Sequence, residues 1–406
     1  MKRRILLLSY YFEPDLSAGS FRAEALVKAL LEEGGDDIQI DVVTTLPNRY
    51  RSFRARTSRS EKHGALRIRR IAVPTHQGGV IDQTRSFLAY ARGVLRITRR
   101  EHYDLVVATS SRLMTATLGA IVARRQRASL YLDIRDILVD ALPELLPKTF
   151  GRLATLLFSR IERWTIQKAT QVNLISPGFL SYFTSRYPAR AFTVHTNGVD
   201  DLFLPMVSSE ESSAPPGLMQ VLYAGNIGEG QGLHHVLPAL AKRLEGEAYF
   251  RVVGAGSAHG RLARALSRHD VHNVELLPPI KRSDLVSLYQ SADVLFLHLN
   301  RNRAFRRVLP SKLFEYAATG KPIWAGVSGY PAEFVEQKII NTAIFRPCDV
   351  ESAVAALRRL NLSSVCRSGF VAIYSRRSIQ KEMASDVLGA LDQHRSENCL
   401  SAKKAP

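Results

Sequence analysis

The sequence predicts an α/β protein of two doubly wound domains, each a parallel sheet covered by helices on both faces. Short apolar runs typical of buried strands alternate with helical patterns along nearly the whole chain. The alternation stops at 205–217, a polar stretch rich in Ser, Glu and Pro, and then restarts. We therefore expect the two domains to face a central cleft, with ligands beyond the carboxyl ends of the strands.

The first half is expected to open with a strand at 5–9 and a helix at 20–33 that ends at Gly34 and Gly35. Its further strands are expected at 38–44, 105–108, 129–133, 171–175 and 192–195. The second half should hold strands at 220–224, 249–253, 274–277, 294–297 and 322–325. The predicted boundaries are a domain at 1–200, a linker at 201–218 and a domain at 219–373, with 396–406 as a flexible tail.

Composition indicates a globular chain of 406 residues, with 56 Lys and Arg against 37 Asp and Glu and a formal charge of +19. The three cysteines lie too far apart for the usual zinc patterns, and we expect no metal site and no cofactor. The apolar run at 5–8 is too short for a signal peptide or a membrane span. We expect a soluble, cytoplasmic chain whose positive excess either meets an anionic partner or aids solubility.

Positive charge gathers between Arg49 and Arg70, where Glu61 is the only acid. The basic residues there are Arg49, Arg51, Arg54, Arg56, Arg59, Lys62, Arg67, Arg69 and Arg70. The segment has little apolar pattern before Leu66, so we expect an exposed loop that leads into a strand. A nucleic-acid surface is not expected, because stacking aromatics do not interleave with the cations.

Two glycines, Gly254 and Gly256, directly follow a predicted strand, as in the dinucleotide-binding fingerprint. The third glycine of that fingerprint is replaced by His259, which argues against a hydride-transfer enzyme. The pair favours a turn that lets a nucleotide approach the backbone. A purely structural strand-to-helix turn is the alternative.

A helix is expected to start at Pro310 and Ser311 and to stop at Gly320. Ser311 and Lys312 would then lie at its N-terminus, where free N–H groups and the helix dipole attract phosphate. Glu315 lies one turn later, near the face that Ser311 presents. Alternatively Glu315 is a capping-box acid, although with Ser311 as N-cap that box would require a Glu in place of Phe314.

Motifs spread over most of the chain resemble one known family. They are residues 10–14 with 18–22, 132–136, 197–200, 223–228 with 231–233, 291–294 and 310–322. Their order and spacing resemble the family 4 glycosyltransferases of the GT-B fold, the "glycosyl transferases group 1". Within that family the sequence is most similar to the branch that builds bacterial surface polysaccharides, such as the fucosamine transferases.

The resemblance implies a nucleoside-diphosphate sugar, UDP-linked by default, held mainly by the C-terminal domain. Glu315 would bind the donor ribose hydroxyls and Ser311 and Lys312 the diphosphate. Gly19 would give a tight turn facing the diphosphate, and Gly254 and Gly256 would shape the nucleobase pocket. It also implies that a helix at 374–394 returns to the N-terminal domain.

The sequence departs from the family pattern at three donor-side positions. Arg307 stands where the first Glu of a Glu-x7-Glu pair is usual, and Asn226 and Gln231 stand where Arg and Lys usually grip the diphosphate. We expect Arg303, Arg306 and Arg307 to supply the missing cations. A solvated basic loop is the alternative.

The implied reaction transfers a sugar without a metal ion and with retention of anomeric configuration. Arg135 and Asp136 follow a predicted strand and, with Lys312, are the expected catalytic residues, with Asp133 or Glu13 as substitute bases. An ordinary surface ion pair of Arg135 with Asp136 is the alternative.

In this branch the acceptor is often a lipid-linked sugar, and a saccharide acceptor is also possible. We expect the segment Arg49–Arg70 to dock on the anionic inner face of the plasma membrane. Three other functions stay open: a nucleotide-sugar 2-epimerase of the same fold, a non-catalytic GT-B-like subunit, and a nucleic-acid-binding protein.

Overall fold

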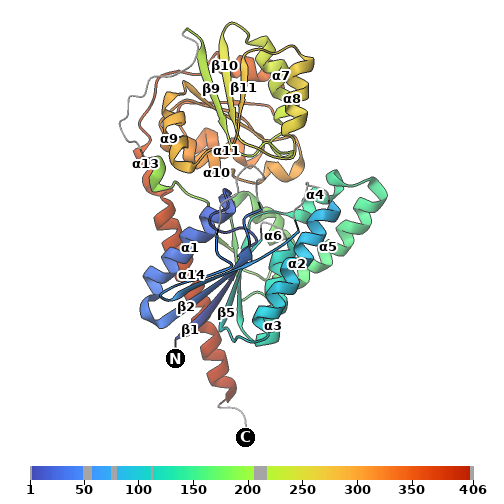
Figure 1. Ribbon diagram of the computed structural model, residues 1–406, viewed down its shortest axis with the longest axis vertical. Helices are drawn as coiled ribbons and strands as arrows, with labels where there is room; N and C mark the ends of the chain where they lie inside the picture. Colours follow the sequence, from blue (N-terminus) through green and yellow to red (C-terminus); the bar gives the residue numbers. More distant parts are fainter. Residues whose placement is uncertain (1, 49–56, 75–79, 111–112, 205–216, 403–406) are drawn as a thin grey trace. The chain divides into compact units, whose positions relative to one another are not determined.

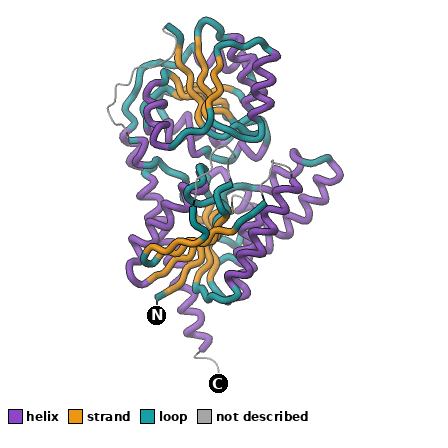
Figure 2. The backbone as a smooth tube through the Cα atoms, in the orientation of Figure 1, coloured by secondary structure: helices purple, strands orange, loops and turns teal. Residues whose placement is uncertain are grey.

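The computed structural model describes residues 2–48, 57–74, 80–110, 113–204 and 217–402, and the chain forms two compact units. The N-terminal unit comprises Met1–Asn197 and Arg377–Pro406, and the C-terminal unit comprises Gly198–Arg376. Each unit is a mainly parallel sheet between helices (Figure 1), which confirms the predicted fold class. Figure 2 shows the strands of both units in orange among purple helices.

The sheet of the N-terminal unit has the order β3-β4-β2-β1-β5-β6-β7-β8, and β3 alone among these strands runs antiparallel to its neighbour. Its strands are β1 (Arg3–Leu8), β2 (Ile38–Thr45), β3 (Ser60–His63), β4 (Leu66–Ile71), β5 (Leu105–Ser110), β6 (Ser129–Ile134), β7 (Gln171–Leu174) and β8 (Thr193–Val194). The chain order reverses between β1 and β5, and the carboxyl ends of strands at such a point are where ligands bind.

Helices α1 and α14 cover one face of this sheet, and α2, α3 and α5 cover the other (Figure 1). The helices of the unit are α1 (Ala18–Gly34), α2 (Val80–Thr98), α3 (Leu113–Gln126), α4 (Leu138–Leu145), α5 (Lys148–Lys168), α6 (Leu180–Arg186) and α14 (Arg376–Ala402). Helix α14 starts and ends later than the predicted 374–394 and includes most of the predicted tail. Tyr374 terminates the preceding helix, and no proline interrupts α14 before Pro406.

The sheet of the C-terminal unit is parallel, with the order β11-β10-β9-β12-β13-β14. Its strands are β9 (Met219–Ala224), β10 (Ala248–Val253), β11 (Val274–Leu277), β12 (Val294–His298), β13 (Ile323–Gly326) and β14 (Thr342–Phe345). Its helices are α7 (Leu233–Arg243), α8 (His259–Arg268), α9 (Arg282–Ser291), α10 (Ser311–Ala318), α11 (Tyr330–Lys338), α12 (Val350–Leu357) and α13 (Ser368–Ile373). Here the order reverses between β9 and β12.

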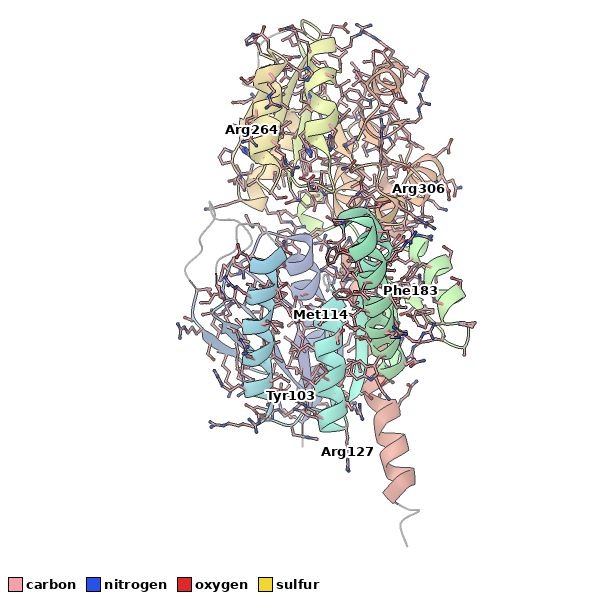
Figure 3. All side chains as sticks on the ribbon, turned by 90° about the vertical axis from the view of Figure 1, so that its right-hand side faces the viewer. Tyr103, Met114, Arg127, Phe183, Arg264 and Arg306 are labelled. Carbon is pink, nitrogen blue, oxygen red and sulfur yellow. The ribbon has the colours of Figure 1, made fainter. Side chains whose placement is uncertain are left out.

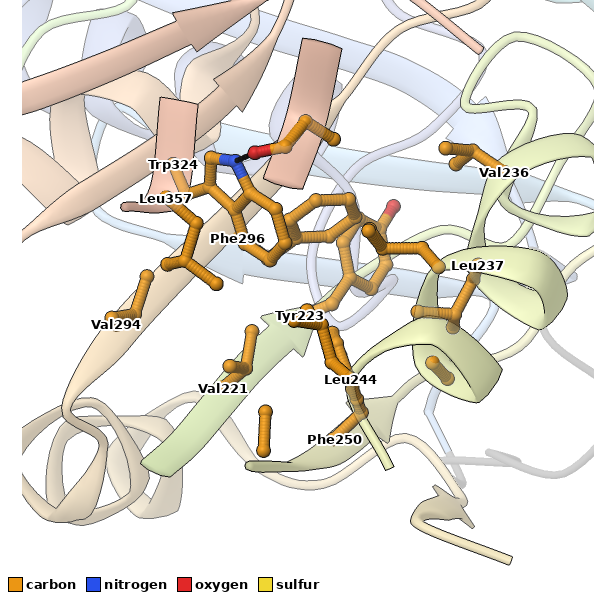
Figure 4. Close-up of a cluster of buried hydrophobic side chains, with 14 of the residues drawn as sticks. Val221, Tyr223, Val236, Leu237, Leu244, Phe250, Val294, Phe296, Trp324 and Leu357 are labelled. Carbon is orange, nitrogen blue, oxygen red and sulfur yellow. Dashed lines mark hydrogen bonds between the residues drawn. The ribbon is translucent and has the colours of Figure 1, made fainter. Parts of the chain in front are cut away.

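Aromatic packing forms the centre of one face of the C-terminal sheet (Figure 4). The Trp324 ring lies edge-on to Phe296, with 5.0 Å between centroids, and its indole N–H donates to the carbonyl of Ala353 at 3.1 Å. Because the single polar atom of Trp324 is satisfied, this large side chain can be fully buried at no unmet hydrogen-bond cost.

The chain passes between the units at Asn197 and Gly198, earlier than the predicted linker at 201–218. Phe203 already belongs to the core of the C-terminal unit, where it packs on Tyr289, so polar composition alone placed the boundary too late. Residues 205–216 of the predicted linker lie outside the described residues.

A buried ion pair joins distant parts of the N-terminal unit. The Arg22 guanidinium of α1 donates to both oxygens of Asp133 at 2.9 Å and to the carbonyls of Thr196 at 2.6 Å and His195 at 2.8 Å. Asn173 donates to the same carboxylate at 2.7 Å. Burial alone would raise the pKa of Asp133, but the charge of Arg22 outweighs it and the pKa is lowered. Asp133 is therefore a structural anion, and the expectation that it could serve as a substitute base is wrong.

The expected strand after the basic loop is present as β4, but residues 60–63, expected in the loop, form the further strand β3. Arg67 and Arg69 reach Asp41 and Glu101, with Arg69 2.9 Å from Asp41 and 2.7 Å from Glu101. The Tyr103 hydroxyl, labelled in Figure 3, donates to Asp41 at 2.6 Å. The acids that neutralise these arginines come from other strands and loops, so the local count of charges did not reveal them.

Arg70 also binds partners inside the N-terminal unit. Its side chain is buried, pairs with Glu61 at 2.7 Å and donates to the carbonyl of Glu13 at 3.1 Å. Arg49, Arg51, Arg54 and Arg56 lie outside the described residues. Among the helices that the structure describes, none is long and apolar enough to cross a membrane.

We expect Arg22→Met to lower the free energy of unfolding of the N-terminal unit by about 3–5 kcal/mol, because Asp133 would stay buried without its cation. Urea unfolding followed by fluorescence in a Trp324→Phe background measures it, since Trp164 of α5 is then the only tryptophan. Arg92→Met, at an exposed site on α2, is the control and should change the free energy by less than about 0.5 kcal/mol. Equal effects of the two changes would contradict the assigned role.

Candidate functional site

The candidate donor site of the C-terminal unit lies at the carboxyl ends of β9 and β12, where the strand order reverses. Three segments meet the solvent there: the loop 225–232 after β9, the loop 299–310 after β12, and the first turn of α10. Helix α10 begins at Ser311, with Pro310 as its N-cap. With this N-cap, the capping-box position is Leu313, so the structure excludes a capping role for Glu315.

Glu315 lies on the buried side of α10 and is only 8 % exposed. Its Oε2 accepts a hydrogen bond from the hydroxyl of Tyr289 on α9 at 3.1 Å. Burial, and then the charge of Glu315, raise the pKa of Tyr289 well above its ordinary value, so the hydroxyl stays protonated and donates. Tyr289 thus fixes the carboxylate through Oε2.

Lys312 stands in the first turn of α10 and reaches back to the end of β9. Its ammonium lies 5.1 Å from the centre of the Tyr223 ring. A side chain at Gly225 would collide with this ammonium, and Gly225 adopts a φ of +140° that favours glycine. The Lys312 ammonium therefore lies against the backbone of Gly225, just after the end of β9.

The glycines of the loops after β9 and β10 allow these loops to touch. Gly254 has a φ of +149°, and a side chain there would collide with the carbonyl of Gly225; one at Gly256 would collide with Ile227. The N–H of Gly225 donates to Val253 at 2.7 Å, and the N–H of Ile227 donates to Ala255 at 2.9 Å. Gly254 and Gly256 thus have a packing role, whatever part they take in a nucleobase pocket.

Asn226 and Gln231 are brought together, as their shared expected role requires. The Asn226 amide donates to Gln231 Oε1 at 2.6 Å, and the N–H of Gly228 donates to the same oxygen at 3.2 Å. Two amides can bond at this distance, whereas two cations would repel each other. The replacement of the usual Arg and Lys is thus a matched pair.

His298, at the end of β12, binds the backbone of the same loop. It was not identified as a site residue from the sequence. Its Nδ1 lies 2.6 Å from the carbonyl of Gln231, and its Nε2 accepts the N–H of Cys348 at 2.9 Å. This arrangement requires the neutral ring with the proton on Nδ1, and burial lowers the pKa of His298 to about 4. A histidine that ends a buried strand was the available signal.

The arginines 303, 306 and 307 lie where expected, in the segment just before α10. Arg303 and Arg306 bound a short 3-10 helix, both with exposed side chains, and Arg307 is partly buried. The backbone of Arg306 packs on Gly329, whose φ is +67°. The segment is therefore anchored to the unit through its backbone.

In the N-terminal unit the structure brings Gly19 and Arg135 together, each near the carboxyl end of a strand. Gly19 lies in the first turn of α1, which Ser17 caps by accepting the N–H of Ser20 at 3.1 Å. A side chain at Gly19 would collide with the Arg135 guanidinium. Asp136 has an exposed side chain and accepts the N–H of Ile137 at 2.9 Å.

Each of the two units matches a known family. The family described as Glycosyl transferases group 1 matches residues 208–367, and the Glycosyl transferase 4-like domain matches residues 19–198. The chain belongs to the group 1 glycosyltransferases. Each match covers most of one unit, and together they confirm the family resemblance found in the sequence. The likeness to fucosamine transferases stays a prediction.

Known relatives of this glycosyltransferase agree. The putative colanic acid biosynthesis glycosyl transferase WcaI of Escherichia coli K12 is 25 % identical over 305 residues, 71 % of this chain and 73 % of that protein. WaaG, a glycosyltransferase of lipopolysaccharide biosynthesis, has a TM-score of 0.62 at 15 % identity, covering 96 % and 98 % of the two chains. Anabaena HepE, solved with UDP, has a TM-score of 0.54 at 17 % identity, covering 99 % and 100 %. These structures confirm the GT-B fold.

Three side chains in and just after the loop 225–232 are of types that bind metal ions. The ligand atoms of Glu229, His234 and His235 lie within 4.8 Å of one another. Glu229 also pairs with Arg261, so a cation there would have to displace an arginine of the glycosyltransferase. The expectation of a metal-free reaction stays a prediction.

We expect protonation of His298 to destabilise the C-terminal unit at acidic pH. The unfolded ring gains its proton near 6.5 and the folded ring only near 4, so the unfolding free energy falls by about 3 kcal/mol between pH 7 and pH 4. The variant His298→Asn has no ring to protonate, so its unfolding free energy should not fall for this reason. The difference in unfolding free energy between wild type and His298→Asn should therefore become smaller as the pH falls.

Urea unfolding in a Trp164→Phe background measures this gap, because Trp324 then reports on the C-terminal unit alone. His272→Asn, at an exposed site with its side chain 73 % accessible, is the matched control and should leave the gap to wild type unchanged with pH. A His298→Asn gap that stays constant from pH 7 to pH 4 would show that the ring is not held neutral.

Proposed function

We propose that this glycosyltransferase moves a sugar from a nucleoside-diphosphate donor to a lipid-linked or saccharide acceptor in surface polysaccharide synthesis. A UDP-sugar is the first donor to test. The observation that carries the donor assignment is the first two turns of α10. They present the Lys312 ammonium and the positioned Glu315 carboxylate at the point where the strand order reverses. The relatives named for colanic acid and lipopolysaccharide biosynthesis, and HepE with its UDP, support the substrate class.

In this proposal Glu315 Oε1 accepts hydrogen bonds from the ribose hydroxyls. The diphosphate meets the Lys312 ammonium and the N-terminus of α10 at Ser311, where the helix dipole favours negative charge. Negative charge grows on the diphosphate as the anomeric bond breaks, and these donors stabilise it without a metal ion. Arg307, with Arg303 and Arg306, adds positive charge that the amides of Asn226 and Gln231 do not supply.

The N-terminal unit is proposed to hold the acceptor. Asp136 is the proposed base for the acceptor hydroxyl, because its side chain is accessible, whereas the neighbouring Asp133 is consumed by Arg22. Arg135 and the turn at Gly19 are proposed to stabilise the leaving diphosphate. Transfer with retention is part of the proposal and follows the family.

We also propose that the enzyme works in the cytoplasm, peripheral to the inner face of the plasma membrane. Arg67, Arg69 and Arg70 cannot contribute to this attachment, because acids of the N-terminal unit neutralise them. The remaining basic positions of the segment are Arg49, Arg51, Arg54, Arg56, Arg59 and Lys62.

We expect Glu315→Gln to weaken binding of UDP at least tenfold, because a hydrogen bond to a charged group contributes about 1.5–3 kcal/mol. Calorimetric titration with UDP, GDP and ADP measures it and identifies the base. Tyr289→Phe should weaken binding less, since it frees the carboxylate without removing it. Glu336→Gln, at an exposed site of α11, is the control and should bind like wild type.

The outcome that contradicts the donor site is binding of none of these nucleotides, or equal binding by Glu315→Gln and wild type. Release of nucleoside diphosphate only when an acceptor is present separates the transferase from an epimerase, which needs no acceptor.

We expect Asp136→Asn to lower turnover by about 10²–10⁴-fold, because the acceptor hydroxyl would lose its base, while UDP affinity stays unchanged. Nucleoside-diphosphate release and calorimetry measure the two effects. Asp140→Asn, four residues later on α4, is the comparison variant. If Asp136→Asn turns over like wild type, another group is the base.

A further inference from the structure

Helix α5 carries large apolar side chains on its exposed face. Phe150 is 70 % exposed, Leu153 66 %, Leu156 52 % and Leu157 54 %, the densest group of exposed large apolar residues among those the structure describes. Phe150, Leu153 and Leu157 follow a spacing of three and four residues, so they share one side of the helix. Isolated apolar residues on a surface are ordinary, but a continuous stripe indicates a contact surface.

The stripe lies opposite the side of α5 that packs inward. Gly151, Glu162, Thr165 and Ile166 are buried, and the Thr165 hydroxyl meets that of Thr117 on α3 at 3.0 Å. Figure 3 views the side of the N-terminal unit on which α5, in green, lies. Folding of the unit therefore explains the inward side of the helix and leaves the apolar stripe unexplained.

The charges beside the stripe have one sign. Arg152, Arg160 and Arg163 are exposed on α5. Its one acid, Glu162, points inward and accepts hydrogen bonds from Tyr182 at 3.1 Å and Tyr187 at 2.9 Å. The exposed acid nearby is Glu144, on α4.

A basic hollow adjoins the stripe. It has a volume of about 220 Å³ and is lined by Leu156, Ser159, Arg160, Arg163, Arg186 and Tyr187. Arg186 is held over the Tyr182 ring at 4.4 Å from its centre, so its position is set from within the unit. Three guanidinium groups around one hollow suit a phosphate group.

We propose that the exposed face of α5 docks the enzyme on an anionic phospholipid surface. The apolar stripe enters the boundary of the acyl chains, and Arg160, Arg163 and Arg186 meet lipid phosphates. Apolar side chains beside cations, without an exposed acid on the helix, are the pattern of an interfacial helix. A second protein copy fits less well, because the same arginines would face each other. This inference rests on the membrane attachment proposed above and names its surface, but it does not rest on the transferase reaction.

Co-sedimentation with vesicles tests the proposal on the full chain. Wild type should bind vesicles of equal parts phosphatidylglycerol and phosphatidylcholine at least tenfold more tightly than pure phosphatidylcholine. Arg160→Gln with Arg163→Gln should bind the anionic vesicles about 30-fold more weakly, since each cation near such a surface contributes about fivefold. Leu153→Gln with Leu157→Gln should lose at least tenfold. Matched changes on α2, Arg92→Gln with Arg96→Gln, should bind like wild type.

Trp164, seven residues after Leu157 on the same side of α5, supplies a local readout. In Trp324→Phe it is the only tryptophan, and lipids brominated in their acyl chains should quench it. Weak binding of wild type to anionic vesicles, equal binding by the α5 and α2 variants, or no quenching would overturn the proposal. So would a dimer that Leu153→Gln with Leu157→Gln separates while vesicle binding persists. Urea unfolding of the α5 variants in the Trp324→Phe background, followed through Trp164, confirms that their N-terminal unit folds.

Discussion

The buried pair of Arg22 and Asp133 is the constraint on which the N-terminal unit depends. Neither charge can lie alone in the core, so α1, β6 and the residues after β8 have to assemble together. Helix α14 joins the same point, because Met383 approaches the Arg22 guanidinium at 3.2 Å. A segment from the far end of the chain is thereby tied to the first helix.

This pair also explains why two sequence motifs carry both structure and function. In each motif one residue points into the core and a close neighbour emerges at the carboxyl ends of the strands. Gly19 precedes Arg22 by less than one helical turn, and Arg135 follows Asp133 by two residues. Because the inward residues bind each other, their partly buried neighbours Gly19 and Arg135 are brought into contact. Precise placement of this second pair thus depends on the buried pair.

Much of the fold and part of the candidate site could be predicted from the sequence. The strands are strongly apolar, and the start of α10 is marked by Pro310 followed by Ser311. The pairing of Asn226 with Gln231, and its support by His298, could not be predicted. That support crosses 67 residues of sequence and depends on backbone angles at Gly225 that residue types do not specify. Tyr289 was missed for the same reason, since only the packing of α9 against α10 directs its hydroxyl to Glu315.

Charge was the least reliable guide, and the reason is geometric. In the segment Arg49–Arg70 a count along the chain finds one acid, yet Arg67 and Arg69 lie on a strand whose neighbours bring Asp41 and Glu101 to them. On α5 the local composition is less basic, but its acid is turned inward and its arginines outward. A cation acts on a partner only where the fold leaves its field unopposed. The net charge of this enzyme therefore has to be assigned to its separate surfaces before it indicates a partner. Among the described residues, the exposed face of α5 is the surface where cations and apolar groups coincide.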